Sequence, residues 1–174
     1  MPVIAVIGAQ WGDEGKGKVV ELLAEKAGVV VRFSGGDNAG HSIVNPYGEF
    51  RLHLVPSGIF FPHTVCIIGN GVVINPAVLL DEMDQLNQRG VNTTRLFISD
   101  RAHLIMPYHI LLDGLEEESR AGKALGTTRK GIGPVKMTSS NLLCLTCFSY
   151  FLRSLTPGPT IMSRELGISL LTRW

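Results

Sequence analysis

The first 28 residues predict a short buried strand, a glycine-rich loop and an amphipathic helix. Val3–Ile7 is a continuous apolar run, as expected of a strand covered on both faces of a parallel sheet. Apolar residues from Lys16 to Ala27 recur at helical spacing, and Gly28 is expected to end that helix. Glycine loops at this junction are typical of phosphate cradles, because backbone amides, the helix N-terminus and lysines all attract oxyanions. The intervening loop, residues 8–18, is Gly-Ala-Gln-Trp-Gly-Asp-Glu-Gly-Lys-Gly-Lys.

The spacing of this loop differs from that of a standard P-loop. Six residues, where a P-loop has four, separate its first glycine from the Gly-Lys pair. Gly17 stands where a Ser or Thr would bind magnesium, so a Mg²⁺ site needs another hard oxygen ligand, for which Asp13 is the candidate. Two simpler interpretations stay open: Asp13 caps the following helix, or the loop is a turn with solvated Lys16 and Lys18.

The remainder of the first 134 residues alternates strands and helices. This order predicts an α/β fold, a P-loop-like, mostly parallel sheet flanked by helices. Glu116–Glu118 is interpreted as a solvated charge run on a helix. Further strands are expected at Val29–Phe33, Phe50–Val55, Val65–Ile68 and Arg95–Ser99, and helices at Pro76–Arg89 and Pro107–Gly122.

Two polar loops carry further candidate ligand groups. His41 ends a loop rich in Gly, Asp and Asn, and its imidazole is suited to donate to a transferring phosphoryl oxygen. Asn38 offers directional hydrogen bonds to a heterocycle or a phosphate. Thr127 and Thr128, in a Gly-flanked loop, suit a monophosphate, as do the two basic residues that follow them. The alternatives are a structural histidine and a surface turn.

Four stretches together resemble adenylosuccinate synthetase in order and approximate spacing. The resemblance covers residues 3–134, so 1–134 is interpreted as the N-terminal part of the GTP- and IMP-binding ligase domain, truncated relative to the family. Residues 135–174 are interpreted as a divergent tail from another reading frame or an alternative exon, with a genuine terminal subdomain as the alternative. The matching stretches are residues 10–18, 36–41, 68–73 and 126–134.

The resemblance implies a reaction and a set of site residues. The family joins IMP and L-aspartate to adenylosuccinate via 6-phosphoryl-IMP, with GTP converted to GDP and phosphate, in AMP biosynthesis and purine salvage. Asp13 would be the base, with His41 and Lys16 as the other catalytic residues, and Asp13 and the Gly40 carbonyl would ligate Mg²⁺. Residues implied to face GTP are Gly12, Asp13, Glu14, Gly15, Lys16, Gly17, Lys18, Gly40, His41 and Ser42. Those implied to face IMP are Asp13, Glu14, Gly15, Lys16, Asn38, Ala39, Gly40, His41 and Thr128.

Several family elements have no match in the chain. No Lys-x-Asp, the family's guanine-recognising element, occurs in it, and Val135 and Lys136 follow Pro134 where the family has a Tyr and acidic residues. The aspartate-binding loop and the arginine that reaches the partner subunit's IMP in the family's homodimer are also unmatched. We therefore expect the isolated chain to be inactive. The alternative is a noncatalytic module that binds a nucleotide or pairs with a full-length subunit.

Composition limits the classes of partner and the cellular location that we expect for the chain. A net charge of +1 over 174 residues provides no electrostatic case for a nucleic-acid or membrane partner. The N-terminal apolar run is too short for a signal peptide, and no run is long enough to span a membrane. Three cysteines indicate a reducing compartment, and Cys144 and Cys147 form a CxxC without the second pair that a zinc site needs. A cytoplasmic location is expected.

Overall fold

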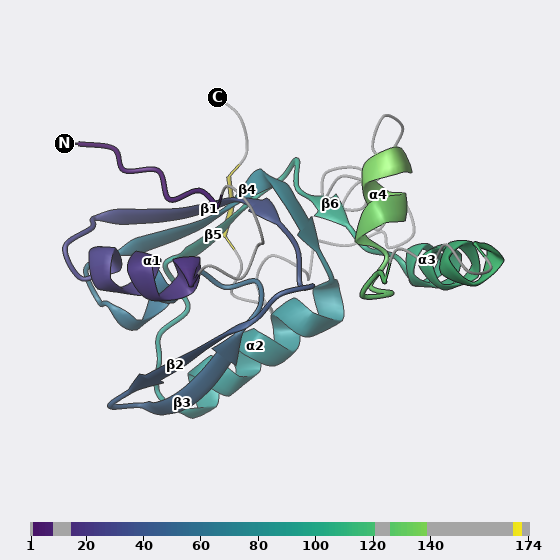
Figure 1. Ribbon diagram of the computed structural model, residues 1–174. Helices are drawn as coiled ribbons and strands as arrows, with labels where there is room; N and C mark the ends of the chain where they lie inside the picture. The colour runs from purple at the N-terminus through teal and green to yellow at the C-terminus, as the bar shows by residue number, and fades with distance from the viewer. Residues whose placement is uncertain (1, 9–14, 121–125, 139–168, 172–174) are drawn as a thin grey trace, which may run out of the picture.

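A computed structural model describes residues 2–8, 15–120, 126–138 and 169–171, and in these the sheet is entirely parallel. Its strands run in the order β1-β4-β5-β7, and β6 pairs with the distal part of β4 (Figure 1). This confirms the predicted mostly parallel α/β sheet. The strands are β1 (Val29–Gly35), β4 (Val65–Ile74), β5 (Leu96–Ser99), β6 (His103–Leu104) and β7 (Ser169–Leu171).

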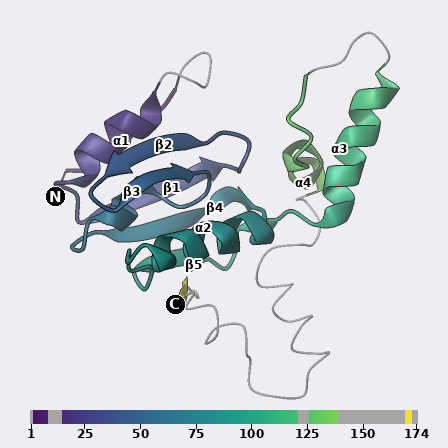
Figure 2. The ribbon, with the colours of Figure 1, turned by 90° about the horizontal axis from the view of Figure 1, so that it is seen from below.

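Helices and an antiparallel hairpin accompany this sheet. The hairpin and α2 lie on the same face of the sheet, whereas α3 and α4 pack together beyond one end of it (Figures 1 and 2). No helix in the described ranges is long and apolar enough to cross a membrane. The elements are α1 (Lys16–Ala24), β2 (His41–Asn45), β3 (Gly48–Leu52), the 3₁₀ turn η1 (Ser57–Phe60), α2 (Pro76–Gln88), α3 (Pro107–Ser119) and α4 (Ile132–Thr138).

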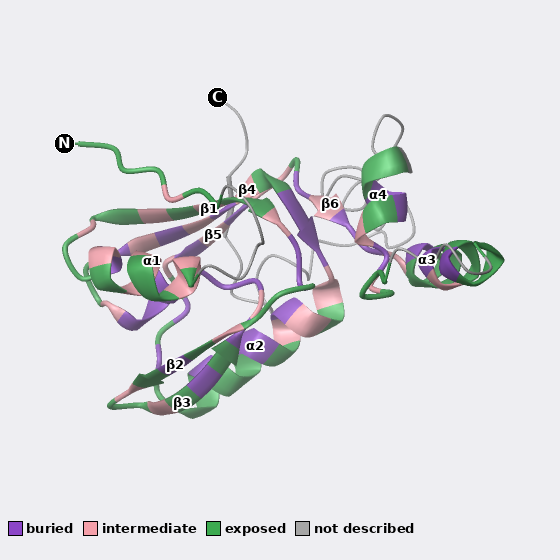
Figure 3. Cartoon of the chain, in the orientation of Figure 1, coloured by how far each residue is buried: buried purple, intermediate pink, exposed green. Residues whose placement is uncertain are grey.

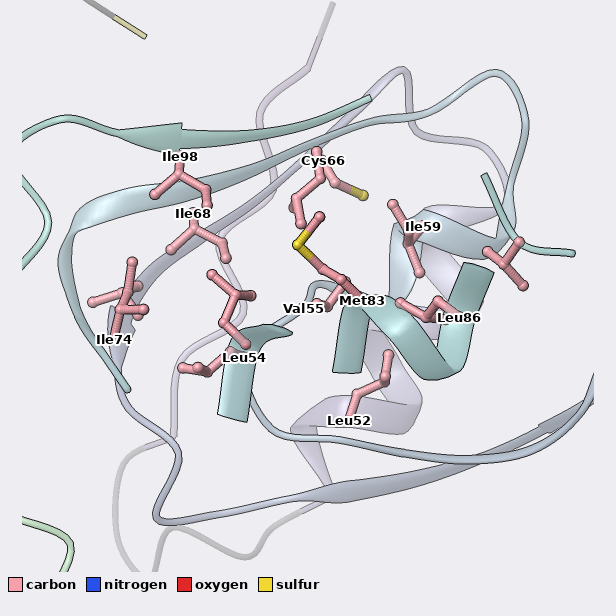
Figure 4. Packing of buried hydrophobic residues seen from close by; sticks show 14 of the residues in the cluster. Leu52, Leu54, Val55, Ile59, Cys66, Ile68, Ile74, Met83, Leu86 and Ile98 are labelled. Carbon is pink, nitrogen blue, oxygen red and sulfur yellow. The ribbon is translucent and has the colours of Figure 1, made fainter. Parts of the chain in front are cut away.

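The core lies between the sheet and α2, and the sequence of α2 explains its place. Pro76 occupies the first turn, where its missing N–H costs nothing, and the Asn75 side chain caps the helix by accepting from the Ala77 N–H. Leu79, Met83 and Leu86 recur at helical spacing and are buried in the core cluster. Figure 3 shows the buried stripe of α2, and Figure 4 shows Met83 and Leu86 facing the sheet. Opposite them lie apolar side chains of the sheet strands, Cys66, Ile68, Ile74 and Ile98.

The strand expected at Val65–Ile68 is longer than predicted. It continues through Gly69, Asn70 and Gly71 to Ile74, because its second half pairs with the end of β1 and with β6. The β1 register shifts between Arg32 and Ser34, and a Cβ at Gly71 would lie 2.3 Å from the Phe33 carbonyl oxygen. The glycine therefore permits a close backbone approach rather than ending the strand.

The strand predicted at Val3–Ile7 is not formed. Residues 2–8 have no regular structure, and Val3 and Ile7 are 95% and 74% exposed. Strand formation requires a neighbouring strand and a covered face, and this segment pairs with no strand in the described part of the chain. A β-branched composition alone is not sufficient.

Further elements differ from the sequence-based expectations. The predicted strand Phe50–Val55 ends at Leu52, and its partner β2 was not anticipated. The helix predicted to reach Ala27 ends at Ala24, and the one predicted to reach Gly122 ends at Ser119. Helix α4 crosses position 134, and its Val135 is buried. The proposed origin of the residues beyond 134 remains a prediction.

Candidate functional site

The N-terminus of α1 carries the described part of the glycine loop. Gly15 caps this helix at φ +76°, a left-handed conformation that favours glycine, and its carbonyl accepts from the Lys18 N–H at 3.0 Å. Lys16 is the first helical residue and is half-buried, whereas Lys18 is exposed. Gly12, Asp13 and Glu14 lie outside the described residues, so the roles predicted for them remain predictions.

The second glycine loop, residues 36–41, reaches α1 through His41. A Cβ on Gly17 would lie 2.9 Å from both Cβ and Cγ of His41, so the imidazole packs directly on the first turn of the helix. Burial lowers the pKa of His41, and the positive charges of Arg32 and His53 lower it further. The ring is therefore neutral near pH 7. Its Nε2 is buried and has no hydrogen-bond partner among the described residues.

The loop that precedes His41 is exposed on one side and supported on the other. Asn38, Ala39 and Gly40 are exposed, as is Ser42. A Cβ on Gly40 would lie 2.6 Å from Cε1 of His53, so this ring supports the loop from within. The described residues contain no group of three or more His, Cys, Asp or Glu side chains that could hold a metal.

A buried charged cluster beneath this loop was not recognised in the sequence. Arg32 on β1 donates to the Gly36 carbonyl at 2.6 Å. Burial lowers the pKa of Arg32, although the charges of Glu82 and Asp37 act to raise it. Both carboxylates are buried, at 5% and 1% exposure. Two signals were present: an arginine within an apolar strand, and a glutamate on the apolar face of α2.

The threonine loop, residues 126–131, is held by hydrogen bonds to two buried carboxylates of α3. Glu117 Oε1 accepts from the Gly126 N–H at 2.6 Å and the Thr127 N–H at 3.3 Å, and Asp113 Oδ2 accepts from the Gly131 N–H at 2.8 Å. Thr127 and Thr128 are themselves exposed. The prediction that Glu117 is solvated is wrong, because its i, i+4 spacing from Asp113 turns both carboxylates toward the loop.

Lys130 joins the threonine loop to the second glycine loop. Its Nζ donates to the Asp37 carbonyl at 2.6 Å and lies 3.6 Å from Oδ2 of the same residue. A Cβ on Gly36 would lie 2.7 Å from Cδ1 of Ile132, so the backbone of Gly36 also packs closely on the Ile132 side chain. The structure thus connects three segments that carry predicted site residues: the α1 N-terminus, the loop before His41 and the threonine loop.

A parallel α/β sheet, with a glycine at the start of a helix and a second glycine loop packed on that helix, is an arrangement typical of the class of nucleotide-binding α/β proteins. The family model of adenylosuccinate synthetase matches residues 5–144. The chain therefore belongs to the adenylosuccinate synthetase family, which confirms the resemblance drawn from its motifs.

Individual relatives agree with this assignment. The chain is 69% identical over 134 residues to an adenylosuccinate synthetase of Dehalococcoides mccartyi, a match that covers 77% of this chain and 32% of the relative. It is 59% identical over 134 residues to that of Moorella thermoacetica, covering 77% and 31%. The chain thus spans about a third of the length of these curated relatives.

Solved structures show the same fold. Fully ligated adenylosuccinate synthetase from Plasmodium falciparum superposes with a TM-score of 0.71 at 32% identity, covering 91% of this chain and 41% of that one. Succinoaminodeoxyadenylate synthetase of cyanophage S-2L, bound to dGMP and dATP, gives a TM-score of 0.62 at 20% identity and covers 91% and 42%, a likeness of fold alone.

Proposed function

We propose that this chain provides the surface on which an adenylosuccinate synthetase holds IMP and the phosphates of GTP. The observation that carries the proposal is the packing of His41 on Gly17, which joins the helix N-terminus to the second glycine loop. The bridge from Lys130 to Asp37 adds the threonine loop to the same surface. One continuous surface made of three such loops suits a nucleoside monophosphate beside a triphosphate.

Each part of this surface has a role in the proposed GTP-dependent ligation of IMP and L-aspartate. The α1 N-terminus and Lys16 attract the GTP phosphates. Asp13 removes the proton from the purine ring nitrogen, so the exocyclic oxygen on the neighbouring ring carbon attacks the γ-phosphorus of GTP and GDP leaves. The neutral His41 donates a hydrogen bond to the transferred phosphoryl group. The amine of aspartate then displaces phosphate from 6-phosphoryl-IMP. Thr128 faces IMP.

Magnesium and the cellular setting are part of the same proposal. Of the two predicted Mg²⁺ ligands, Gly40 lies among the described residues and is exposed, and a backbone carbonyl is the kind of hard oxygen donor that this ion prefers. Bound Mg²⁺ would neutralise charge on the phosphates. We further propose a cytoplasmic protein that forms the homodimer of its family.

Titration calorimetry with IMP, followed by an assay of adenylosuccinate formation, tests the proposal. The chain is expected to bind IMP with 1:1 stoichiometry, and Lys16→Ala to weaken that binding. Lys26→Ala is the matched control, because Lys26 is an exposed lysine just beyond the same helix. We expect no steady adenylosuccinate formation by the isolated chain, and measurable turnover would refute that part. A folded chain that does not bind IMP would refute the proposed site.

The exposed stripe of α3 favours a second candidate, a noncatalytic module that pairs with a full-length subunit. Tyr108, Leu111, Leu112 and Leu115 recur at helical spacing and are 44%, 63%, 40% and 53% exposed. Light scattering of the chain mixed with the Dehalococcoides mccartyi enzyme is expected to show a mixed dimer if this candidate is right. Leu111→Glu would then abolish the mixed species, and separate elution of the two unmodified proteins would contradict the candidate.

A further inference from the structure

Glu82 is a buried carboxylate in the middle of an otherwise apolar helix face. It lies on α2 between Leu79 and Met83, with 5% of its surface exposed. The neighbouring acidic residues Asp81 and Asp84 are exposed on the opposite side of the helix. A carboxylate at a core position is unfavourable unless it is hydrogen-bonded, so its partners indicate its role.

The partners of Glu82 are three consecutive backbone N–H groups. Its carboxylate accepts from the N–H of His53 at 2.5 Å, from that of Leu54 at 3.1 Å and from that of Val55 at 2.9 Å. These three residues directly follow β3, and their N–H groups point to one carboxylate instead of to a neighbouring strand. This explains why the strand predicted to reach Val55 ends at Leu52.

The first of these residues carries the ring that supports the second glycine loop. The His53 imidazole lies against Gly40, where a Cβ would come within 2.6 Å of its Cε1 and 2.9 Å of its Nδ1. Gly40 leads directly into His41, which packs on Gly17 at the start of α1. Each step in this series is a close packing contact or a hydrogen bond, so a shift of the turn after β3 is transmitted to the loop.

From these contacts we infer that Glu82 is a positioning residue, which sets the path of the loop from Asn38 to His41 through the backbone of residues 53–55 and the ring of His53. The inference rests on the proposed function, because Glu82 would control the affinity of this loop for a nucleotide. Glu82 is not among the residues predicted to face a ligand, and its hydrogen-bond partners are backbone N–H groups. Its effect on binding therefore depends on His53.

The substitution Glu82→Gln tests this with little change in volume. Its amide nitrogen cannot accept hydrogen bonds and would face the backbone N–H groups that an oxygen now faces. Asp84→Asn is the matched control, because it removes the same charge from the exposed side of the same helix. In the full chain, with circular dichroism and thermal unfolding as checks on folding, Glu82→Gln is expected to weaken IMP binding at least tenfold and Asp84→Asn less than twofold.

A double-mutant cycle with His53→Ala separates positioning from general stability. If Glu82 acts through the ring of His53, then His53→Ala weakens IMP binding, and Glu82→Gln adds no further loss in the double variant. IMP affinity of a folded Glu82→Gln chain within twofold of the unmodified chain would overturn the inference. Losses that multiply in the double variant would overturn it as well.

A spectroscopic readout makes the inference independent of ligand binding. The ¹H–¹³C resonances of the His53 imidazole are expected to move in Glu82→Gln and to stay in place in Asp84→Asn. If the unmodified chain does not bind IMP, the proposed function fails, and unmoved His53 resonances would then separately overturn the positioning role. If Glu82→Gln does not fold, the same resonances are compared in Glu82→Asp, whose shorter carboxylate shifts the turn and keeps the charge.

Discussion

Replacement of Gly17 by alanine tests the contact that joins the two glycine loops. Both Gly17 and Gly114 are helical glycines, in α1 and α3. A Cβ on Gly17 would lie 2.9 Å from Cβ and Cγ of His41 and 3.1 Å from its Cδ2, whereas a Cβ on Gly114 would meet nothing within 4 Å. The same substitution at the two positions should therefore change stability in opposite directions.

The size of the difference follows from two opposing effects. Alanine gains up to about 1 kcal/mol over glycine in a helix at either position. At Gly17 the new methyl would lie 0.5 Å inside the 3.4 Å at which ordinary contact begins (3.4 − 2.9). The His41 Cβ is fixed to the backbone and cannot swing away, so overpacking costs about 1–3 kcal/mol. Gly17→Ala is thus expected to destabilise by roughly 0–2.5 kcal/mol, and Gly114→Ala to stabilise by roughly 0.5–1 kcal/mol.

Urea unfolding followed by circular dichroism measures both variants against the unmodified chain. With slopes of about 1–3 kcal/mol per molar urea, the two midpoints should differ by roughly 1 M, with Gly114→Ala higher. If Gly17→Ala raised the midpoint as much as Gly114→Ala does, His41 would not lie on the first turn of α1. The central contact of the proposed site would then be wrong.

Three further predictions concern buried groups. Burial raises the pKa of the Cys66 thiol to about 12. Peptide mapping should therefore find Cys66 unmodified by iodoacetamide at pH 8 in the folded chain and modified after unfolding. Labelling of Cys66 in the folded chain would contradict its burial. The pKa values of His41 and His109 are lowered in the folded state, so below the ordinary value of 6.5 the unfolded state binds more protons. The free energy of unfolding should therefore fall as the pH is lowered from 7.5 to 5.5, and it should fall less in His109→Gln than in the unmodified chain. An equal fall in the two proteins would show that the pKa of His109 does not contribute. Lys130→Met removes the cation that lies 3.6 Å from the buried Asp37 carboxylate and should cost about 1–3 kcal/mol in urea unfolding, part of which Asp37→Asn in the same chain restores; an unchanged midpoint would count against the bridge.

Elements with strong local signals were predicted well from the sequence. α2 begins at Pro76 as expected, because proline in the first turn and the Asn75 cap are local features. β5 was placed within one residue by its short apolar run. The hairpin partner β2 and the extension of β4 beyond Gly69 were missed, because both depend on pairing with distant strands. The exposed Val3–Ile7 segment is the converse case, a strand-like composition without a pairing strand in the described part of the chain.

In the candidate site, too, the features with local signals were predicted and those that depend on distant residues were missed. Sequence motifs located the glycine and threonine loops, because the residue types and spacing of these loops can be recognised in the amino-acid sequence alone. The groups that hold these loops in place were not located. Glu82, Asp37 and Glu117 are buried carboxylates whose partners lie between 9 and 93 positions away in the sequence. The local sequence does not predict which distant backbone N–H group or lysine a buried carboxylate will contact.

The most direct test of the account is an NMR titration of the ¹⁵N-labelled 174-residue chain with IMP. We predict that amide resonances of residues 38–42 and of residues 126–131 shift together and fit one dissociation constant, because Lys130 and Asp37 join the two loops into one surface. Shifts confined to one loop, or none in a chain whose spectrum is that of a folded protein, would contradict the claim that these loops form a single nucleotide site.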